Sequence, residues 1–341
     1  MARIWSIDEL KAAKRQGTFE EKVPFVLNGK TYEVTKRIVN GEMETFELSR
    51  PIGEMLTSEA SRKELLQKVV LDVELGREQV PILYTPIYER IQDANFPKLL
   101  EAKWAQYGTV IFTEHLEGEE VKFGSLQAEQ GPTVAILGYA AGFEYTKEME
   151  IFNQVFNLEL LNRAFGEAYN AKLNDMHLSP ILSFNYPAGN KTAYQGDVAD
   201  PRWLRVYKTL VKALADTAVA KRPATVLLAA SADRPDIEQA LRGGQVSGTT
   251  YPPVSGISDI IYYDGWSTQV GKKTYTYSGV AAGKCYLIRP KRGFKELVKQ
   301  DLQINATMGD ITRLVESQIV GDFWRGVFAA VQENVQEVAL A

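Results

Sequence analysis

The 341-residue chain has few of the side chains on which most enzymes and metal proteins depend. Its single cysteine, Cys285, cannot form an internal disulfide, and its two histidines, His115 and His177, come without an HExxH motif or a third ligand at metal spacing. No GxGxxG loop follows an apolar strand, and no GxSxG nucleophile elbow occurs. We therefore predict a protein that is not an enzyme, with no catalytic residue, no cofactor and no metal.

One segment comes near to a phosphate-binding loop without meeting its requirements. GVAAGKC at 279–285 has three residues between its glycines where four are needed, and no Ser or Thr follows Lys284. The segment also leads into strand-forming residues, whereas a phosphate loop opens a helix. We expect Cys285 to be a small buried hydrophobic residue, and both histidines to be packed or at the surface.

Long apolar runs and a strong charge of either sign are missing as well. The longest uncharged apolar run, Gly131–Phe143, is shorter than the roughly 18–20 residues of a membrane span, and Met1–Gly17 lacks the apolar core of a signal peptide. Ser6 and Glu9 instead form a capping box that predicts a short first helix. The net charge of −4 argues against tight binding of nucleic acid through its phosphates, and we expect neither export nor a membrane span.

What the chain does contain is a core large enough for two domains. Hydrophobic residues make up 45% and charged residues 24% of the sequence, with no low-complexity tract and no fixed repeat. Near the start, Val23–Leu48 carries the turn-forming pairs Asn28-Gly29 and Asn40-Gly41 between strand-forming runs. This pattern predicts a three-stranded meander, which either packs on its own domain or reaches a neighbouring molecule.

A long hairpin is predicted in the middle of the chain. Tyr107–His115 and Val134–Ala141 are rich in β-branched and aromatic residues, and a polar, acidic, glycine-punctuated loop separates them. So many charges could not be buried within the same chain, and we expect an exposed arm that contacts another subunit. The candidate contact residues at the tip of this arm are Glu117, Glu119, Glu120 and Lys122.

The hairpin leads into a predicted helix of roughly 30 residues, Phe143–Leu173, about 45 Å long. Ile151, Val155 and Leu158 begin one apolar line at helical spacing, and a second line lies beside it, which indicates burial on two sides. Pro180 is expected to stop the helix. Further predicted elements are a helix at 201–220, a strand at 224–230, a helix capped by Asp233 and closed by Gly243 and Gly244, a strand at 257–265, a hairpin around 270–273, a strand at 284–289 and a long strand at 310–320.

In this order, several phrases of the sequence resemble the major capsid protein of tailed bacteriophages, the HK97-type shell protein. The resemblance covers about residues 50–341 and is one of element order and local phrases, because that family has no catalytic signature. The phrases are LEGEEVKFG (116–124), YTKEME (145–150), NRAFGEAYNAKLND (162–175), HLSPI (177–181), DRPDIEQAL (233–241), GKCYLIRP (283–290) and GDITRLVESQIVGDFWRGVF (309–328).

The resemblance implies an α+β fold in named parts. These are an N-terminal arm or meander at 1–50; a peripheral domain at 51–106, 142–183 and 305–322 with a spine helix at 143–175; an extended loop at 107–141; and an axial α/β domain at 184–304 and 323–341.

The same resemblance implies a structural protein of the virion that assembles itself, through hexamers and pentamers, into an icosahedral shell around double-stranded phage DNA. Scaffolding, portal and decoration proteins would be partners, the DNA would be contacted weakly and without sequence specificity, no membrane would be involved, and assembly would take place in the host cytoplasm. Two alternatives remain: an encapsulin-type nanocompartment shell, which shares this fold, and a cytoplasmic α/β enzyme built on the 224–242 unit.

Overall fold

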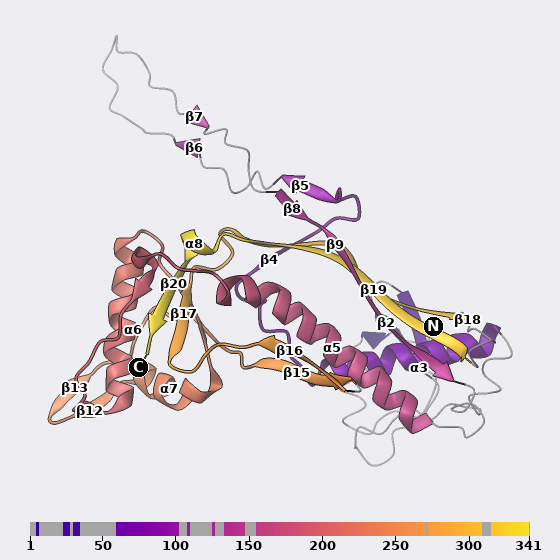
Figure 1. The fold of residues 1–341 in the computed structure, drawn as a ribbon, viewed down its shortest axis with the longest axis horizontal. Helices are drawn as coiled ribbons and strands as arrows, with labels where there is room; N and C mark the ends of the chain where they lie inside the picture. Colours follow the sequence, from indigo (N-terminus) through magenta and orange to yellow (C-terminus); the bar gives the residue numbers. More distant parts are fainter. Residues whose placement is uncertain are drawn as a thin grey trace, which may run out of the picture. The chain divides into compact units, whose positions relative to one another are not determined.

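The fold is described from a computed structural model (Figure 1). It is a mixed α+β fold, as predicted, and its contacts divide it into two compact units. The first unit comprises Met1–Pro81, Gly138–Lys172 and Gln300–Trp324, and the second comprises Ile82–Leu137, Leu173–Lys299 and Arg325–Ala341. The described residues are 5–6, 23–27, 30–34, 59–101, 108–109, 125–126, 133–146, 155–270, 272–308 and 315–340.

Helices and long strands build the first unit. Helix α3 (Glu59–Arg77) packs on the beginning of helix α5 (Val155–Leu182). Strands β18 (Phe294–Met308) and β19 (Val315–Ala329) lie in a sheet of order β4-β18-β19-β9, whose outer members are β4 (Glu89–Gln92) and β9 (Leu137–Thr146). The first unit holds this sheet's β9 from Gly138, β18 from Gln300 and β19 up to Trp324, and β4 belongs to the second unit. Phe323 of β19 stacks on Tyr139 and meets the edge of Tyr169, so one face of this sheet is closed by α5.

The second unit is organised around a five-stranded sheet of order β10-β20-β17-β11-β14. Helices α6 (Arg202–Val219) and α7 (Arg234–Arg242) cover one of its faces, and their apolar residues form a core with alternate residues of β11, β17 and β20. Tyr186, which follows α5, contacts Tyr286 on the opposite face. The strands are β10 (Lys191–Thr192), β11 (Val226–Ala229), β14 (Asp259–Tyr262), β17 (Lys284–Ile288) and β20 (Val335–Ala339).

Smaller elements complete the described chain. Antiparallel pairs join β12 to β13, β15 to β16, β5 to β8 and β6 to β7. Their bounds are β12 (Gly244–Val246), β13 (Thr249–Tyr251), β15 (Gly265–Val270), β16 (Lys273–Ser278), β5 (Leu99–Glu101), β8 (Thr133–Ala135), β6 (Gly108–Thr109) and β7 (Ser125–Leu126); η2 (Ala188–Asn190), η3 (Ser231–Asp233) and α8 (Val331–Asn334) are single turns.

The first two strands of the predicted N-terminal meander are confirmed. Strands β2 (Val23–Leu27) and β3 (Lys30–Val34) pair around Asn28-Gly29. The third strand of this sheet is β1 (Trp5–Ser6), which is parallel to β2. The predicted helix after Ser6, the second Asn-Gly pair and the third strand of the predicted meander lie outside the described residues.

The bounds of the predicted spine helix, 143–175, are wrong at both ends. Residues 143–146 belong to β9, where Glu144 accepts a hydrogen bond from Gln318 of β19 at 3.1 Å, because sheet pairing overrides the helical spacing of this segment. At the other end the helix continues through Pro180 to Leu182. Proline removes one backbone hydrogen bond in the last turn, but the fully buried Leu178 and Ile181 hold that turn in the core.

The pairing predicted for the central hairpin and the bounds of the last long strand also differ. Residues 108–109 pair with 125–126, and 133–135 pair with 99–101, because the following residues pair with β19 instead of returning along 107–115. The last long strand does not stop at residue 320 but continues to Ala329, and 309–314 lie outside the described residues. In the sheet β19 lies between β18 and β9, and Gly321 stands inside the strand.

Candidate functional site: the arm root and a buried polar cluster

The root of the predicted arm is firmly built into the second unit. Val134 and Ile136, at and just after β8, are buried against Leu297 and Phe328 of the two long strands. The Ile136 amide donates a hydrogen bond to the Lys98 carbonyl at 2.8 Å. These contacts anchor the described base of the predicted arm in the core of the second unit.

The four candidate contact residues at the tip, Glu117, Glu119, Glu120 and Lys122, lie outside the described residues, and their role stays a prediction. Next to the root of the arm, Leu99 of β5 is an exposed apolar side chain, at 63% exposure. Its neighbour Leu100 packs on the root core. Leu99 and Leu137 therefore leave apolar surface exposed beside the root of the arm.

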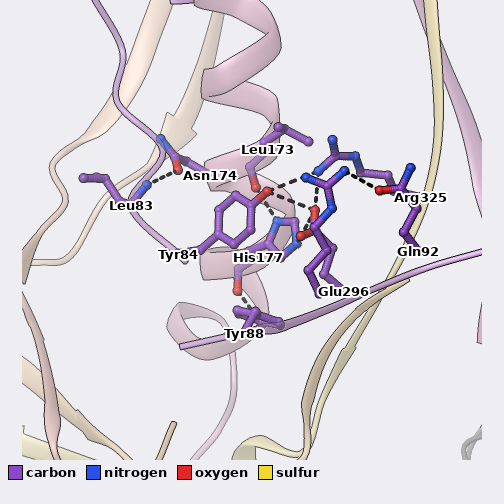
Figure 2. A network of polar contacts seen from close by, with 10 residues as sticks. Leu83, Tyr84, Tyr88, Gln92, Leu173, Asn174, His177, Glu296 and Arg325 are labelled. Atoms are coloured by element: carbon purple, nitrogen blue, oxygen red, sulfur yellow. Dashed lines mark hydrogen bonds and ion pairs between the residues drawn. The ribbon is translucent and has the colours of Figure 1, made fainter. Parts of the chain in front are cut away.

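A buried polar cluster is the second candidate site (Figure 2). It combines His177 of α5, Glu296 of β18 and Arg325 of β19 with Tyr84 and Tyr88, which lie in the turn after α3. All five side chains belong to the second unit, and none is more than 4% exposed. Such a grouping brings together residues up to 241 positions apart in the sequence.

His177 is fixed on several sides. Its ring lies flat on Tyr84, with centroids 3.5 Å apart and planes at 3°, and meets Tyr88 edge-on at 4.8 Å. Its Nδ1 donates to the Leu173 carbonyl at 2.7 Å, which leaves Nε2 as the lone-pair nitrogen, 3.5 Å from Oε1 of Glu296. The Tyr88 hydroxyl donates to the backbone carbonyl of His177 at 2.7 Å.

Glu296 receives most of the donors of the cluster. Arg325 forms a close ion pair with its Oε1, and the Tyr84 hydroxyl donates to the same oxygen at 2.9 Å. Nη1 of Arg325 also donates to the Tyr84 hydroxyl at 3.2 Å. A buried carboxylate is tolerated in a fold when a cation and hydrogen bonds compensate it, and this carboxylate has both.

The electrostatics keep the histidine neutral. Burial lowers the pKa of His177 from 6.5 to about 3; the hydrogen bond to Leu173 opposes that shift, and the positive charge of Arg325 adds to it. Burial, with the nearby Glu296 carboxylate, raises the pKa of Tyr88 well above its usual value. Neither group titrates near neutral pH, and both are closed off from solvent. The cluster is therefore suited to holding chain segments together and not to acting on a substrate.

The sequence predicts that His177 is either packed or at the surface, and the structure shows that it is packed. The partners of His177 were not predicted. A signal for them exists in the charged residues that interrupt apolar strands, as Glu296 does in FKELV and Arg325 does in FWRGVF. Charged residues inside such runs are seldom buried unless they are paired. Periodicity reveals that each is buried, but it does not reveal which residue each one pairs with.

The residues of the enzyme alternative have structural contacts. Cys285 is fully buried in β17, as predicted, and burial raises the pKa of its thiol. Lys284 extends from the same strand to Glu337 of β20 at 2.9 Å. Asp233 does not cap α7 with its side chain, contrary to the prediction; it accepts a hydrogen bond from the Gly283 amide at 2.7 Å and pairs with Arg202 at 2.5 Å. Pro235 removes a donor that a cap would use.

Within the described parts of the chain, no three His, Cys, Asp or Glu side chains come together as a metal site. The helices among these residues also lack the combination of length and apolar content that a membrane crossing requires.

No family model matches the chain, and no curated protein matches its sequence. Solved structures resemble it in fold. The capsid of Myoviridae phage XM1 is 9% identical, with a TM-score of 0.49 over 75% of this chain and 90% of that chain. A virus-like particle from Pyrococcus furiosus is 11% identical, with a TM-score of 0.49 over 80% and 99%. The SrpI encapsulin from Synechococcus elongatus is 10% identical, with a TM-score of 0.45 over 78% and 87%. At these values, the likenesses name proteins of similar fold and assign no function to this chain.

Proposed function

We propose that this protein is the major capsid protein of a tailed bacteriophage, a structural protein that assembles with copies of itself into an icosahedral shell around double-stranded DNA. The observation that carries the proposal is the arm, in which a tightly packed root at 133–136 supports a segment that pairs only with itself among the described residues. Such a segment gains stability from contact with another chain.

The arrangement of polar groups supports a structural role. The cluster around His177 is closed to solvent, and Lys284 and Asp233 are engaged in contacts within the fold. A catalytic site needs a base, nucleophile or metal within reach of a substrate, and the described residues hold no cluster of three metal-ligating side chains. Five of the seven sequence phrases that resemble capsid proteins fall on described elements of the fold, namely α5, α7, β17 and β19.

Assembly would follow from geometry. Different surfaces of identical chains meet in a heterologous contact, which closes into rings when the rotation permits, so that one chain forms both hexamers and pentamers. Individually weak contacts suffice, because each subunit of a closed shell makes many of them at once. We propose Glu117, Glu119, Glu120 and Lys122 as contact residues between subunits. Scaffolding, portal and decoration proteins, weakly bound DNA and assembly in the host cytoplasm belong to the same proposal.

Electron microscopy of the purified protein tests the proposal directly. We expect closed particles with hexamers and pentamers, and packaged DNA when the particles come from infected cells. Particles that enclose a protein cargo instead would favour the encapsulin alternative. A protein that stays monomeric under all conditions of concentration and salt would contradict both.

The arm can be tested separately. Deletion of Leu116–Gly131 should leave folded, soluble subunits or capsomers that no longer form stable shells, and replacement of Glu117, Glu119 and Glu120 by glutamine should reduce the particle yield. A matched control replaces Glu144, Asp197 and Asp259, three exposed acidic residues outside the arm, with their amides. Equal particle yields from the arm variants and the control would contradict the assignment of the arm.

A further inference from the structure

The chain passes five times from one compact unit to the other. The passages follow Pro81, Leu137, Lys172, Lys299 and Trp324. Each passage is a single covalent connection, so the two units are joined by five segments. The segments belong to the turn after α3, the start of β9, the middle of α5, and the two long strands β18 and β19.

Four of these five connecting segments each contribute one side chain to the buried cluster. Each of these side chains lies at the end of its segment that belongs to the second unit. Tyr84 follows the first passage, His177 follows the passage within α5, and Glu296 precedes the passage within β18. Arg325 is the first residue after the last passage. Hydrogen bonds, an ion pair and a stacked ring join these four side chains directly to one another. Within the second unit, the cluster therefore ties together the ends of segments that are far apart in the sequence.

The weak point of the cluster is Nε2 of His177. This nitrogen makes no hydrogen bond with the described residues, and it lies 3.5 Å from Oε1 of Glu296. Both atoms are hydrogen-bond acceptors while the histidine is neutral, so neither can donate to the other. Arg325 already occupies that carboxylate oxygen together with the Tyr84 hydroxyl. A proton on Nε2 would place a second buried positive charge beside Arg325, with one carboxylate for two cations.

We propose that the His177 cluster is an acid-sensitive clasp, which holds the four connecting segments together while His177 is neutral and releases them when His177 takes up a proton. The clasp is a property of the second unit and does not depend on what the shell encloses.

Three segments of the chain place charged or titratable groups next to His177. Tyr84 and Tyr88 face it from the turn after α3, Glu296 from β18 and Arg325 from β19. Protonation of Glu296 at low pH would also weaken the ion pair. A variant that alters the histidine alone is therefore needed to separate the two effects.

The size of the effect follows from linkage. In the open cluster the histidine would have its ordinary pKa of about 6.5, and in the closed cluster its pKa is about 3. Opening is then coupled to the uptake of one proton between these values, and the open population at pH 5 is about 25-fold that at pH 7.

Amide hydrogen exchange of the full-length protein, corrected for intrinsic rates, measures this opening. Peptides that cover 82–92, 173–182, 294–299 and 325–329 should lose protection together, about 25-fold between pH 7 and pH 5. The control peptide is 226–229 in β11, which lies outside the cluster. The His177→Asn variant can still donate to the Leu173 carbonyl but cannot be protonated, so its four cluster peptides should lose no more protection than the control peptide loses. The His115→Gln variant, which alters the other histidine of the chain, should behave like the wild type.

Two outcomes overturn the proposal: wild-type cluster peptides that lose no more protection than the control peptide, or a His177→Asn variant that keeps the wild-type pH dependence. If His177→Asn does not fold, the test uses the His115→Gln variant, in which His177 is the one histidine left in the chain. Exchange of its imidazole C2 hydrogen then measures when the ring of His177 becomes accessible. Its ring should become accessible together with the four amide segments as the pH falls. A ring that titrates near 6.5 while the amides stay protected overturns the clasp.

Discussion

Gly76 of α3 lies directly on the backbone of Arg163 in α5, where a Cβ added to Gly76 would stand 2.1 Å from the Arg163 carbonyl oxygen. Gly166 makes the reciprocal contact, because its Cβ would stand 2.0 Å from the Val73 carbonyl oxygen. Glycine at both positions lets the two helices approach to backbone contact. Buried polar contacts flank the crossing, including Asn162 to Asp72 at 3.1 Å and Arg77 to Asn170 at 3.1 Å.

Replacement of Gly76 or Gly166 by alanine should therefore destabilise the first unit. The added methyl group improves helix propensity by up to about 1 kcal/mol, but it forces the helices apart, and overpacking of this kind costs about 1–3 kcal/mol or more. Thermal or urea unfolding measures the difference. Gly189→Ala is the control, since nothing lies within 4 Å of the added Cβ, and it should change stability by less than about 0.5 kcal/mol. Equal effects at all three positions would contradict the close crossing.

Arg325→Met should be among the most destabilising single changes in the second unit. It leaves the Glu296 carboxylate buried without its cation, which costs about 3–5 kcal/mol, whereas combining Arg325→Met with Glu296→Gln should recover part of the loss. Lys284→Met is the matched control, because its ion pair with Glu337 is half-exposed on the lysine side and should contribute less than about 1 kcal/mol. Similar urea midpoints for the two single methionine variants would argue against the buried pair.

The elements with strong local signals were predictable from the sequence. Helix α6 has a regular apolar face, the β15–β16 hairpin has its turn where predicted, and Cys285 lies in a buried strand. In each of these cases the pattern within about twenty residues decides the structure, because burial on one face of a helix or strand repeats at a fixed period.

Elements decided by distant partners were not predictable in the same way. The Phe143 segment has apolar residues at helical spacing, yet it lies in β9, where Phe143 packs edge-on against Phe165 of α5. The Pro180 stop fails for a related reason, since the buried Leu178 and Ile181 keep the last turn helical. The His177 cluster joins four segments of the chain, and no local spacing connects its members. Periodicity reports burial, and topology decides what is buried against what.

The stability of the protein should fall in mild acid partly because of His177. Its folded-state pKa of about 3 lies below the ordinary 6.5, so below pH 6.5 the unfolded chain binds a proton that the folded chain does not. The free energy of unfolding then decreases as the pH falls from about 6.5 toward 3, by at most about 1.4 kcal/mol per pH unit, and this contribution is fully retained above pH 6.5.

Urea unfolding at pH 7.5, 6 and 5 measures that slope, and the comparison with His177→Asn isolates it, because the carboxylates are common to both proteins. The wild type should lose about 1–2 kcal/mol more than the variant between pH 7.5 and pH 5. His115→Gln should keep the wild-type slope. Parallel pH profiles for wild type and His177→Asn would show that the histidine is not held neutral in the folded state.

Cys285 should be inert in the native protein. Its side chain is fully buried in β17, and burial raises the pKa of the thiol, so both access and the reactive thiolate are suppressed. Iodoacetamide at pH 8 should label the native chain at least about 1,000-fold more slowly than the urea-unfolded chain, because reaction requires opening of the sheet. Rapid stoichiometric labelling without denaturant would place Cys285 at an accessible surface.

Asp233 offers a test between two roles of one carboxylate. At 1% exposure, it accepts the Gly283 amide at 2.7 Å and pairs with Arg202, which also reaches Asp236 at 3.1 Å. A helix cap at this position would contribute about 1 kcal/mol, and serine would replace it with little loss.

If the carboxylate joins α6 and α7 to the loop before β17, as the contacts indicate, serine is too short to reach both partners. Asp233→Ser and Asp233→Ala should then cost about the same, roughly 2–3 kcal/mol each in urea unfolding, because both leave the Gly283 amide without its acceptor. Asp233→Asn keeps that acceptor and should lose less. A serine variant as stable as the wild type would restore the capping role and remove the link between the helices and β17.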